Sequence, residues 1–143
     1  MRISDVLTSK PGGEVVTIGP DATVRELLGL LAEHNIGAVV VSADGEAVDG
    51  IVSERDIVRR LAESDAVLDG AVRAIMTSDV QTCEPDVPVD DLRQLMTERR
   101  IRHVPVVRDG KLVGIISIGD VVKSSIGQLQ FERDQLDTYL HQT

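Results

Sequence analysis

The chain has 143 residues, of which 42% are hydrophobic, and it carries a formal net charge of −9 at pH 7. This length suits one compact domain or two small halves that share a core, and the hydrophobic content argues against general disorder. Aromatic residues make up only 1% of the chain, which argues against stacking platforms for nucleic-acid bases. Because the negative charge also repels a phosphate backbone, we expect no nucleic-acid partner.

The single cysteine, Cys83, cannot form an intramolecular disulfide. The sequence shows no signal peptide and no apolar run of 18 residues. We therefore expect a cytoplasmic protein with no membrane partner, in which Cys83 is an ordinary strand residue.

An internal repeat governs the expected architecture. The segment "GIVSERD" at residues 50–56 returns as "GIISIGD" at residues 114–120, with Gly, Ile, Ser and Asp at matching positions. A preceding segment repeats loosely, because "ISDVLT" at residues 3–8 resembles "VRAIMT" at residues 72–77. The first linker is longer and carries "KPGGE" at residues 10–14.

In chain order, the first copy predicts a strand, a helix, two strands and a second helix. Thr23 and Glu26 form a capping box, and Val24, Leu27, Leu28 and Leu31 follow as an apolar stripe of helical period. Asp44-Gly45 predicts a tight turn between the two inner strands. The expected ranges are strand 15–18, strand 38–41, strand 48–52 and helix 55–62.

The second copy predicts the same order of elements. Its helical stripe consists of Val89, Leu92, Leu95 and Met96, and its tight turn is Asp109-Gly110. The expected ranges are strand 80–83, strand 104–107, strand 112–116 and helix 120–125. Nearly all-apolar strands are usually covered on both faces, so two such units bury their cores most easily against one another.

The last residues, 126–143, lie outside the repeats and predict an amphipathic helix that holds both aromatics, Phe131 and Tyr139. We expect this helix to pack onto its own module. The alternative is that it completes a dimer interface, where aromatic residues are enriched.

A β-α-β-β-α unit that occurs twice, with "IGAVVV", "IRHVPVV" and the closing "DGKLVGIISIGDVV", resembles the CBS domain, and the pair resembles a Bateman module. The resemblance implies an α/β (α+β) fold of two CBS repeats packed pseudo-symmetrically, with a C-terminal helix. Residues 1–70 are then the first repeat with its lead-in, residues 71–125 the second repeat, and residues 126–143 the helical tail.

The resemblance also implies a function. The family consists of sensory modules for AMP, ADP, ATP, NAD or S-adenosylmethionine, which bind in clefts between the two repeats, and many stand-alone members form homodimers. We therefore expect a regulatory module that binds an adenine nucleotide, requires no cofactor, acts on an unidentified protein and is not an enzyme. The alternative is an interaction protein with degenerate, ligand-free clefts.

The two Ser-x-x-Asp segments have a structural and a functional interpretation. Ser53 and Ser117 can cap a helix while Asp56 and Asp120 complete the capping box. The same groups can serve a nucleotide, because a helix N-terminus offers free N–H groups and a carboxylate accepts from both ribose hydroxyls. In the resembled family, these positions contact ribose and phosphate.

The two copies differ where one has Gly37-Ala38 and the other has Arg102-His103. Family members that bind phosphates often carry basic residues here, so we expect Arg102 and His103 to contact phosphate and the Gly37 copy to accept a flat base. We expect the two clefts to differ accordingly.

Arg55 can supply a cation to the neutral cleft or remain a solvated helix residue, and Gly119 allows close approach to the backbone. The nucleotide-binding residues that the resemblance implies are Ile18, Asp21, Ile36, Gly37, Ala38, Val52, Ser53, Arg55, Asp56, Ile101, Arg102, His103, Pro105, Ile116, Ser117, Gly119 and Asp120. His34, His103 and His141 lack partners at metal-ligand spacing, and neither a P-loop nor a catalytic Ser/His/Asp or Cys/His set is evident.

Overall fold

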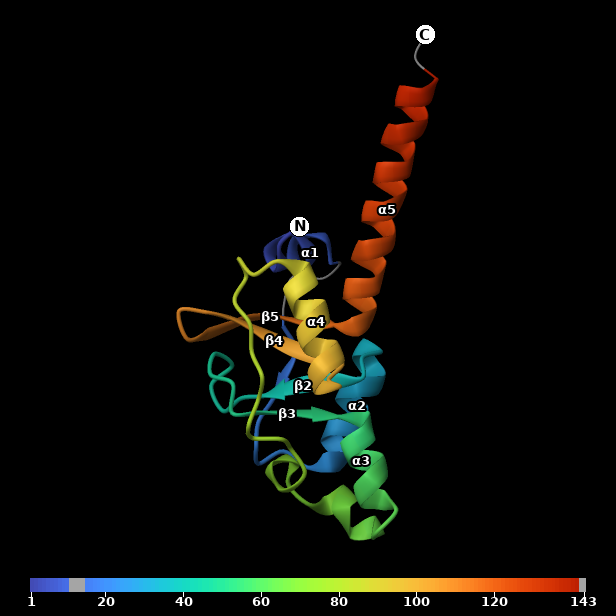
Figure 1. Ribbon diagram of the computed structural model, residues 1–143. Helices are drawn as coiled ribbons and strands as arrows, with labels where there is room; N and C mark the ends of the chain where they lie inside the picture. Colours follow the sequence, from blue (N-terminus) through green and yellow to red (C-terminus); the bar gives the residue numbers. More distant parts are fainter. Residues whose placement is uncertain (11–14, 142–143) are drawn as a thin grey trace.

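The computed structural model describes residues 1–10 and 15–141 of the chain. Figure 1 shows two halves, with β2, β3, α2 and α3 in the lower one and α1, α4, β4 and β5 in the upper one. The elements are α1 (Ile3–Ser9), β1 (Thr17–Ile18), α2 (Val24–His34), β2 (Ala38–Val41), β3 (Gly50–Ser53), α3 (Glu54–Leu61), η1 (Asp65–Asp69), η2 (Val72–Ala74), α4 (Val89–Arg99), β4 (His103–Arg108), β5 (Lys111–Ser117) and α5 (Ile118–Leu140). The expected mixed α/β fold with a C-terminal helix is confirmed.

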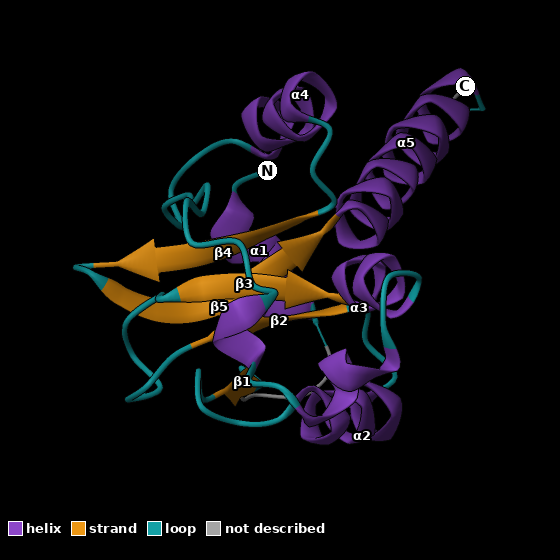
Figure 2. Ribbon diagram, turned by 90° about the horizontal axis from the view of Figure 1, so that it is seen from below, coloured by secondary structure: helices purple, strands orange, loops and turns teal. Residues whose placement is uncertain are grey.

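The strands form two small sheets in the middle of the molecule (Figure 2). In the first sheet the order is β1-β2-β3, with β1 parallel and β3 antiparallel to β2. In the second sheet β4 pairs antiparallel with β5. Helices α2 and α3 and the base of α5 lie together on one side of the strands (Figure 2).

The expected strand 80–83 is wrong, because this segment is reduced to a single parallel bridge between Cys83 and Val106. The Cys83 N–H donates to the carbonyl of Pro105 at 3.0 Å, and the Val107 N–H donates to the carbonyl of Cys83 at 2.8 Å. Pro105 has no N–H with which to continue this ladder toward the preceding residues. In the first half Val40 stands at the corresponding place, and there β1 pairs over two residues.

The Asp-Gly turn is confirmed in the second half and wrong in the first. Asp109 and Gly110 have φ of 52° and 78° and join β4 directly to β5, as a two-residue turn of type I′ requires. In the first half, residues 42–49 form a longer loop between β2 and β3. Asp44 holds this loop by accepting from the N–H groups of Glu46 and Ala47, at 2.9 Å each.

Each half has its own hydrophobic core, and each core is completed by the lead-in segment of the other copy. The first core contains Val72 and Ile75, which belong to the lead-in of the second repeat. The second core contains Ile3 and Val6 of α1, which belong to the lead-in of the first repeat. The backbone follows the same exchange, since the Val72 N–H donates to Ala22 at 2.8 Å and the Ile3 N–H donates to Val87 at 2.9 Å.

The repeated glycine of the two seven-residue segments gives each lead-in room to cross a strand. A Cβ at Gly50 would lie 2.6 Å from the Met76 sulfur and 2.9 Å from the Thr77 carbonyl oxygen. A Cβ at Gly114 would lie 2.5 Å from a terminal carbon of Leu7. A lead-in therefore crosses close to the strand at both glycines, but the contact at Gly50 includes a backbone carbonyl and the contact at Gly114 is with a side chain only.

Helix α5 is longer than expected and leaves the body. The expected helix 120–125 and the expected tail helix are one continuous helix, which projects away from the other elements (Figure 1). Its outer residues are exposed, including Leu129 at 64%, Leu136 at 57% and Tyr139 at 72%. The expectation that this tail packs onto its own module is therefore wrong for its outer part.

We predict that Gly50→Ala destabilises the protein more than Gly114→Ala. At Gly50 the new methyl group meets a backbone carbonyl, which cannot move without breaking the Ile51–Thr77 bridge, so the cost should be about 1–3 kcal/mol. At Gly114 it meets only the end of the flexible Leu7 side chain. Urea unfolding followed by circular dichroism measures both costs, and equal losses would contradict the distinction.

Candidate nucleotide site between the two repeats

A cavity of about 520 Å³ lies between the two halves of the molecule. This volume is in the range of small-molecule sites. The first half contributes the end of α2 and the start of β2, and the second half contributes β4, β5 and the first turn of α5. The lining residues are Leu7, Lys10, Val15, Val16, His34, Asn35, Ile36, Gly37, Ala38, His103, Val113, Gly114, Ile115, Ser117 and Asp120.

Both Ser-x-x-Asp segments cap their helices as the sequence predicts. At the start of α3, the Asp56 carboxylate accepts from the Ser53 N–H at 2.8 Å. At the start of α5, the Asp120 carboxylate accepts from the Ser117 N–H at 2.9 Å, and the Asp120 N–H donates to the Ser117 hydroxyl at 3.1 Å. Only the second pair, Ser117 and Asp120, lines the cavity.

Lys10 supplies the cation of the cavity. Its ammonium lies 2.9 Å from the Asp120 carboxylate and donates to the Ile115 carbonyl at 2.8 Å. The two side chains of the pair are 31% and 22% exposed, so solvent screens them only in part. Burial raises the pKa of Asp120, but the Ser117 N–H and the Lys10 ammonium outweigh it and hold that pKa below its ordinary value.

His103 lies in the cavity as a largely uncharged side chain. Burial lowers the pKa of His103 below its ordinary value, although the carboxylates of Asp120 and Glu54 act in the opposite direction. The imidazole is therefore neutral at pH 7, and one ring nitrogen can donate while the other accepts. A contact between His103 and a phosphate stays a prediction, and at this pH it would be a hydrogen bond from a neutral ring.

The cavity combines features that the sequence assigned to separate clefts. Gly37 and Ala38 of the first copy line it together with His103 of the second, and a Cβ at Gly37 would lie 3.8 Å from the His103 ring. The predicted separation of a neutral cleft from a basic one is therefore wrong for this cavity. Arg102, the expected phosphate contact, is exposed and lies outside the lining residues.

Six of the predicted site residues line the cavity, namely Ile36, Gly37, Ala38, His103, Ser117 and Asp120. Three others, Ile18, Val52 and Ile116, are buried in the two cores. Asp21 is exposed and paired with Arg73, and Arg55 is exposed on α3. The remaining predicted residues, Ser53, Asp56, Ile101, Pro105 and Gly119, lie outside this cavity.

Sequence reasoning missed Lys10 and Glu54. Lys10 falls in the long first linker, 110 residues from Asp120, and no local pattern joins them. Glu54 follows Ser53 and its carboxylate lies 3.5 Å from the position of a Cβ at Gly37. The one available signal was a difference in charge: the loose repeat of the lead-ins aligns Lys10 of the first copy with Asp79 of the second.

Comparison with known proteins identifies the family. The profile of the CBS domain matches residues 3–63 and 72–127. The chain therefore belongs to the CBS-domain family, and it contains a pair of these domains.

Its relatives include both curated sequences and solved structures. It is 36% identical over 146 residues to the mitochondrial CBS domain-containing protein CBSX3 of Arabidopsis thaliana, covering 96% of this chain and 71% of that one. A CBS-domain containing protein from Agrobacterium tumefaciens is 47% identical with a TM-score of 0.82, over 87% of this chain and 99% of that one. The CBS domain pair of protein MJ0100, in complex with 5′-methylthioadenosine and S-adenosyl-L-methionine, is 30% identical with a TM-score of 0.78, over 90% and 98%.

The described residues contain neither a membrane-spanning helix nor a cluster of metal-ligating side chains. Within residues 1–10 and 15–141, no helix has the length and apolar character needed to cross a membrane. In the same residues, His, Cys, Asp and Glu side chains do not gather in groups of three that could hold a metal ion. Burial raises the pKa of the Cys83 thiol to about 11, so that the thiol is protonated at neutral pH.

We predict that Lys10→Met lowers stability at neutral pH and that this loss shrinks in acid. The pKa of Asp120 is lower in the folded than in the unfolded state, so its contribution is fully present above about pH 4 and is lost as the pH falls through the lowered value. We expect a loss of about 1 kcal/mol at pH 7. Urea unfolding at pH 7 and at pH 3 measures it.

The matched control is Lys111→Met. Lys111 pairs with Glu46 at 3.9 Å, but both side chains are more than 60% exposed. This substitution should change stability little at either pH. A Lys10→Met loss that is the same at pH 3 as at pH 7 would show that Lys10 contributes by packing rather than by charge.

Proposed function

We propose that this CBS pair is a regulatory module that binds an adenosine-containing ligand in the cavity between its two repeats. The candidate ligands are AMP, ADP, ATP, NAD and S-adenosylmethionine. The observation that carries the proposal is the position of Asp120, whose carboxylate lies on the cavity at the first turn of α5. The relative in complex with 5′-methylthioadenosine and S-adenosyl-L-methionine supports this ligand class.

The groups around the cavity suit the parts of such a ligand. Ile36 is 36% exposed and precedes Gly37, so that together they offer an apolar, flat surface to a base. The Asp120 carboxylate can accept from both hydroxyls of a ribose. Lys10 offers a charge to a phosphate, and neutral His103 can donate or accept nearby.

Lys10 is also a competitor of the ligand. In the free protein its ammonium donates to one oxygen of the Asp120 carboxylate at 2.9 Å, and an adenosine ribose would use the same carboxylate. A ribose that binds Asp120 must therefore displace Lys10 or share the carboxylate with it. A released Lys10 is then available to a phosphate. A nucleotide can therefore compensate for the lost Lys10–Asp120 ion pair, whereas a neutral nucleoside cannot.

We predict that Asp120→Asn weakens adenosine binding by about 1–3 kcal/mol, because an amide replaces a charged acceptor of two hydroxyl groups. Isothermal titration of the full chain with adenosine, AMP, ATP and S-adenosylmethionine measures the affinity. The matched control is Asp56→Asn, which changes the equivalent capping box outside the cavity. Equal effects of the two substitutions would reduce both carboxylates to helix caps.

We predict that Lys10→Met acts in opposite directions on adenosine and on ATP. It frees Asp120 for the ribose, so adenosine should bind as well as to wild type or more tightly. It removes a cation, so ATP should bind more weakly by about 1–3 kcal/mol, as expected when a charge-assisted partner is lost. Titrations with both ligands decide this, and a parallel loss for both would place Lys10 in the support of the fold.

The second candidate function is an interaction protein whose cavity stays empty. The Lys10–Asp120 pair supports it, since the pair already satisfies the carboxylate without a ligand. Thermal unfolding separates the two, because a ligand at 100 times its dissociation constant stabilises the folded state by about 2.7 kcal/mol. If none of the five candidate ligands at millimolar concentration raises the melting temperature, the interaction protein is favoured.

A further inference from the structure

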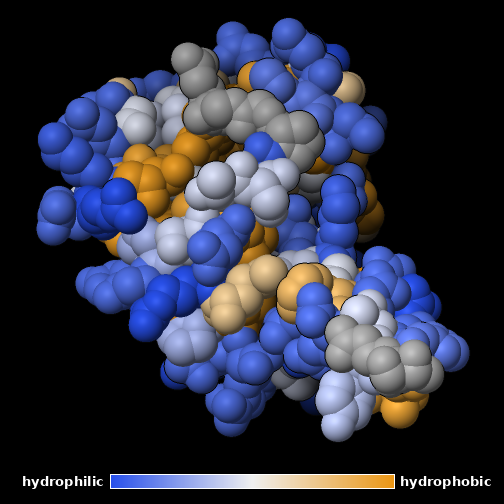
Figure 3. Space-filling view, turned by 90° about the horizontal axis from the view of Figure 1, so that it is seen from above, coloured by the Kyte–Doolittle hydropathy of each residue, from blue (hydrophilic) through white to orange (hydrophobic). Residues whose placement is uncertain are grey.

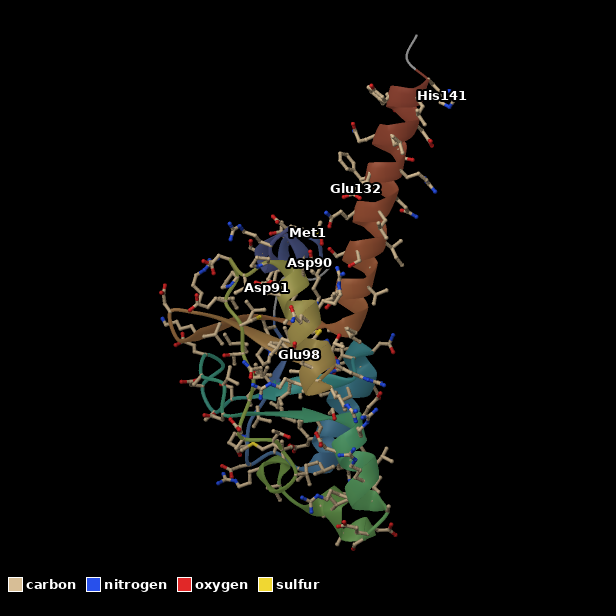
Figure 4. All side chains as sticks on the ribbon, viewed as in Figure 1. Met1, Asp90, Asp91, Glu98, Glu132 and His141 are labelled. Atoms are coloured by element: carbon tan, nitrogen blue, oxygen red, sulfur yellow. The ribbon has the colours of Figure 1, made fainter. Side chains whose placement is uncertain are left out.

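The outer part of α5 exposes apolar side chains that nothing in the body covers. From its base the helix extends well beyond the other elements, and Glu132 and His141 mark the projecting part in Figure 4. Leu129, Leu136 and Leu140 are 64%, 57% and 65% exposed. A free helical segment of this length is marginal in water, so residues 128–140 need a packing partner to stay helical.

The apolar residues follow a coiled-coil heptad. Their spacing alternates between four and three residues, which places Ile126, Arg133 and Leu140 at positions a and Val122, Leu129 and Leu136 at positions d. The apolar members of this seam are all at least half exposed. The seam ends at Leu140, whereas the CBS profile ends at residue 127, so most of it lies beyond the matched family domain.

This seam is distinct from the face of α5 that rests on the body. A groove of about 420 Å³ lies between α1 and α5, and its α5 side is lined by Asp120, Lys123, Ser124, Gly127, Gln128 and Phe131. These residues occupy heptad positions b, c, e and f, so none of the a and d residues of the seam lines the groove. Seen from above, hydrophobic residues show in patches among hydrophilic ones (Figure 3), and Met1 lies beside the helix (Figure 4).

We propose that the seam of α5 pairs with the α5 seam of a second copy of this chain in antiparallel orientation, about a two-fold axis near Phe131. In this register every seam residue finds a partner: Ile126 meets Leu136, Val122 meets Leu140 and Leu129 meets Arg133 of the second copy. The pairing is isologous, as a C2 dimer requires. It places the two bodies at opposite ends of the paired helices.

Charge selects the antiparallel orientation. At the flanking e positions, Lys123 meets Asp137 of the second copy, and by symmetry this contact forms twice. Near the axis Glu132 meets its symmetry mate, and the two Arg133 side chains lie beside this pair. A parallel pair would instead stack Arg133 on Arg133 at position a and place Glu132 opposite Asp137, which joins like charges at each contact.

The first test is the oligomeric state of the full chain by sedimentation equilibrium at micromolar concentration. We expect a dimer, and we expect Leu129→Glu combined with Leu136→Glu to raise its dissociation constant at least tenfold. The matched control is Phe131→Glu, an apolar residue of the same helix that is 63% exposed but lies off the seam. This control should change the dissociation constant less than threefold.

The second test is a charge exchange that distinguishes the two orientations. Asp137→Lys should weaken an antiparallel dimer, because it faces Lys123, whereas it should tighten a parallel dimer by removing a Glu132–Asp137 contact. Lys123→Glu should weaken the dimer as well, and Lys123→Glu together with Asp137→Lys should restore it to within threefold of wild type. Far-UV circular dichroism and thermal unfolding establish that each variant has a folded body.

Three results would overturn the inference. A wild-type chain that is a monomer at micromolar concentration has no such interface. A dimer that survives Leu129→Glu with Leu136→Glu, or that is lost in Phe131→Glu, uses a different face. A dimer that Asp137→Lys tightens is parallel. None of these results depends on ligand binding, so they are independent of the nucleotide titrations.

Discussion

Neither half of this molecule can close its core with its own lead-in, and the rest of the structure depends on that constraint. Ile3 and Val6, at the start of the chain, are 0% and 4% exposed in the core of the second repeat. Val72 and Ile75, in the lead-in of the second repeat, belong to the core of the first. The two repeats therefore form one structural unit. If the lead-in of one repeat unfolds, apolar surface is exposed in the core of the other repeat.

The exchange also determines the composition of the cavity. Because α1 packs on the second repeat, its last turn brings Lys10 to Asp120. The loosely repeated lead-in has Asp79 at the position of Lys10, and a carboxylate there cannot form an ion pair with Asp56. The two halves share the same capping boxes and the same glycines, but they differ in the charge that each lead-in brings to its Ser-x-x-Asp segment. The asymmetry between the copies therefore begins in the lead-ins rather than in Arg102 and His103 alone.

Local interactions were predictable from the sequence, and pairings between distant segments were not. The capping boxes at Ser53 and Ser117 and the turn at Asp109-Gly110 depend on residues within a few positions of one another, and all three are confirmed. The strand expected at residues 80–83 was wrong, because its pairing needs a backbone N–H that Pro105, in another strand, does not have. The continuity of α5 was missed because the end of the repeat was taken as the end of a helix, although the only Gly or Pro between Ser125 and Leu140 is Gly127, and the helix continues through it. The contact of Lys10 with Asp120 could not be predicted without knowing that α1 packs in the core of the second repeat.

Helix α5 connects the cavity to the surface that leaves the body. Its first turn carries Asp120, and Lys10 and Asp120 border both the inter-repeat cavity and the groove between α1 and α5. A ligand that takes the Asp120 carboxylate must change the pair that joins α1 to α5, and a partner that alters this groove acts on the same pair. By thermodynamic linkage, the free energy by which the ligand changes binding of the partner equals the free energy by which the partner changes binding of the ligand. The strength of a partly exposed ion pair, about 1 kcal/mol, then limits what this contact alone can transmit to roughly a fivefold change in affinity. A larger coupling would require the helix itself to move relative to α1, because only the apolar packing at its base offers more free energy than the ion pair.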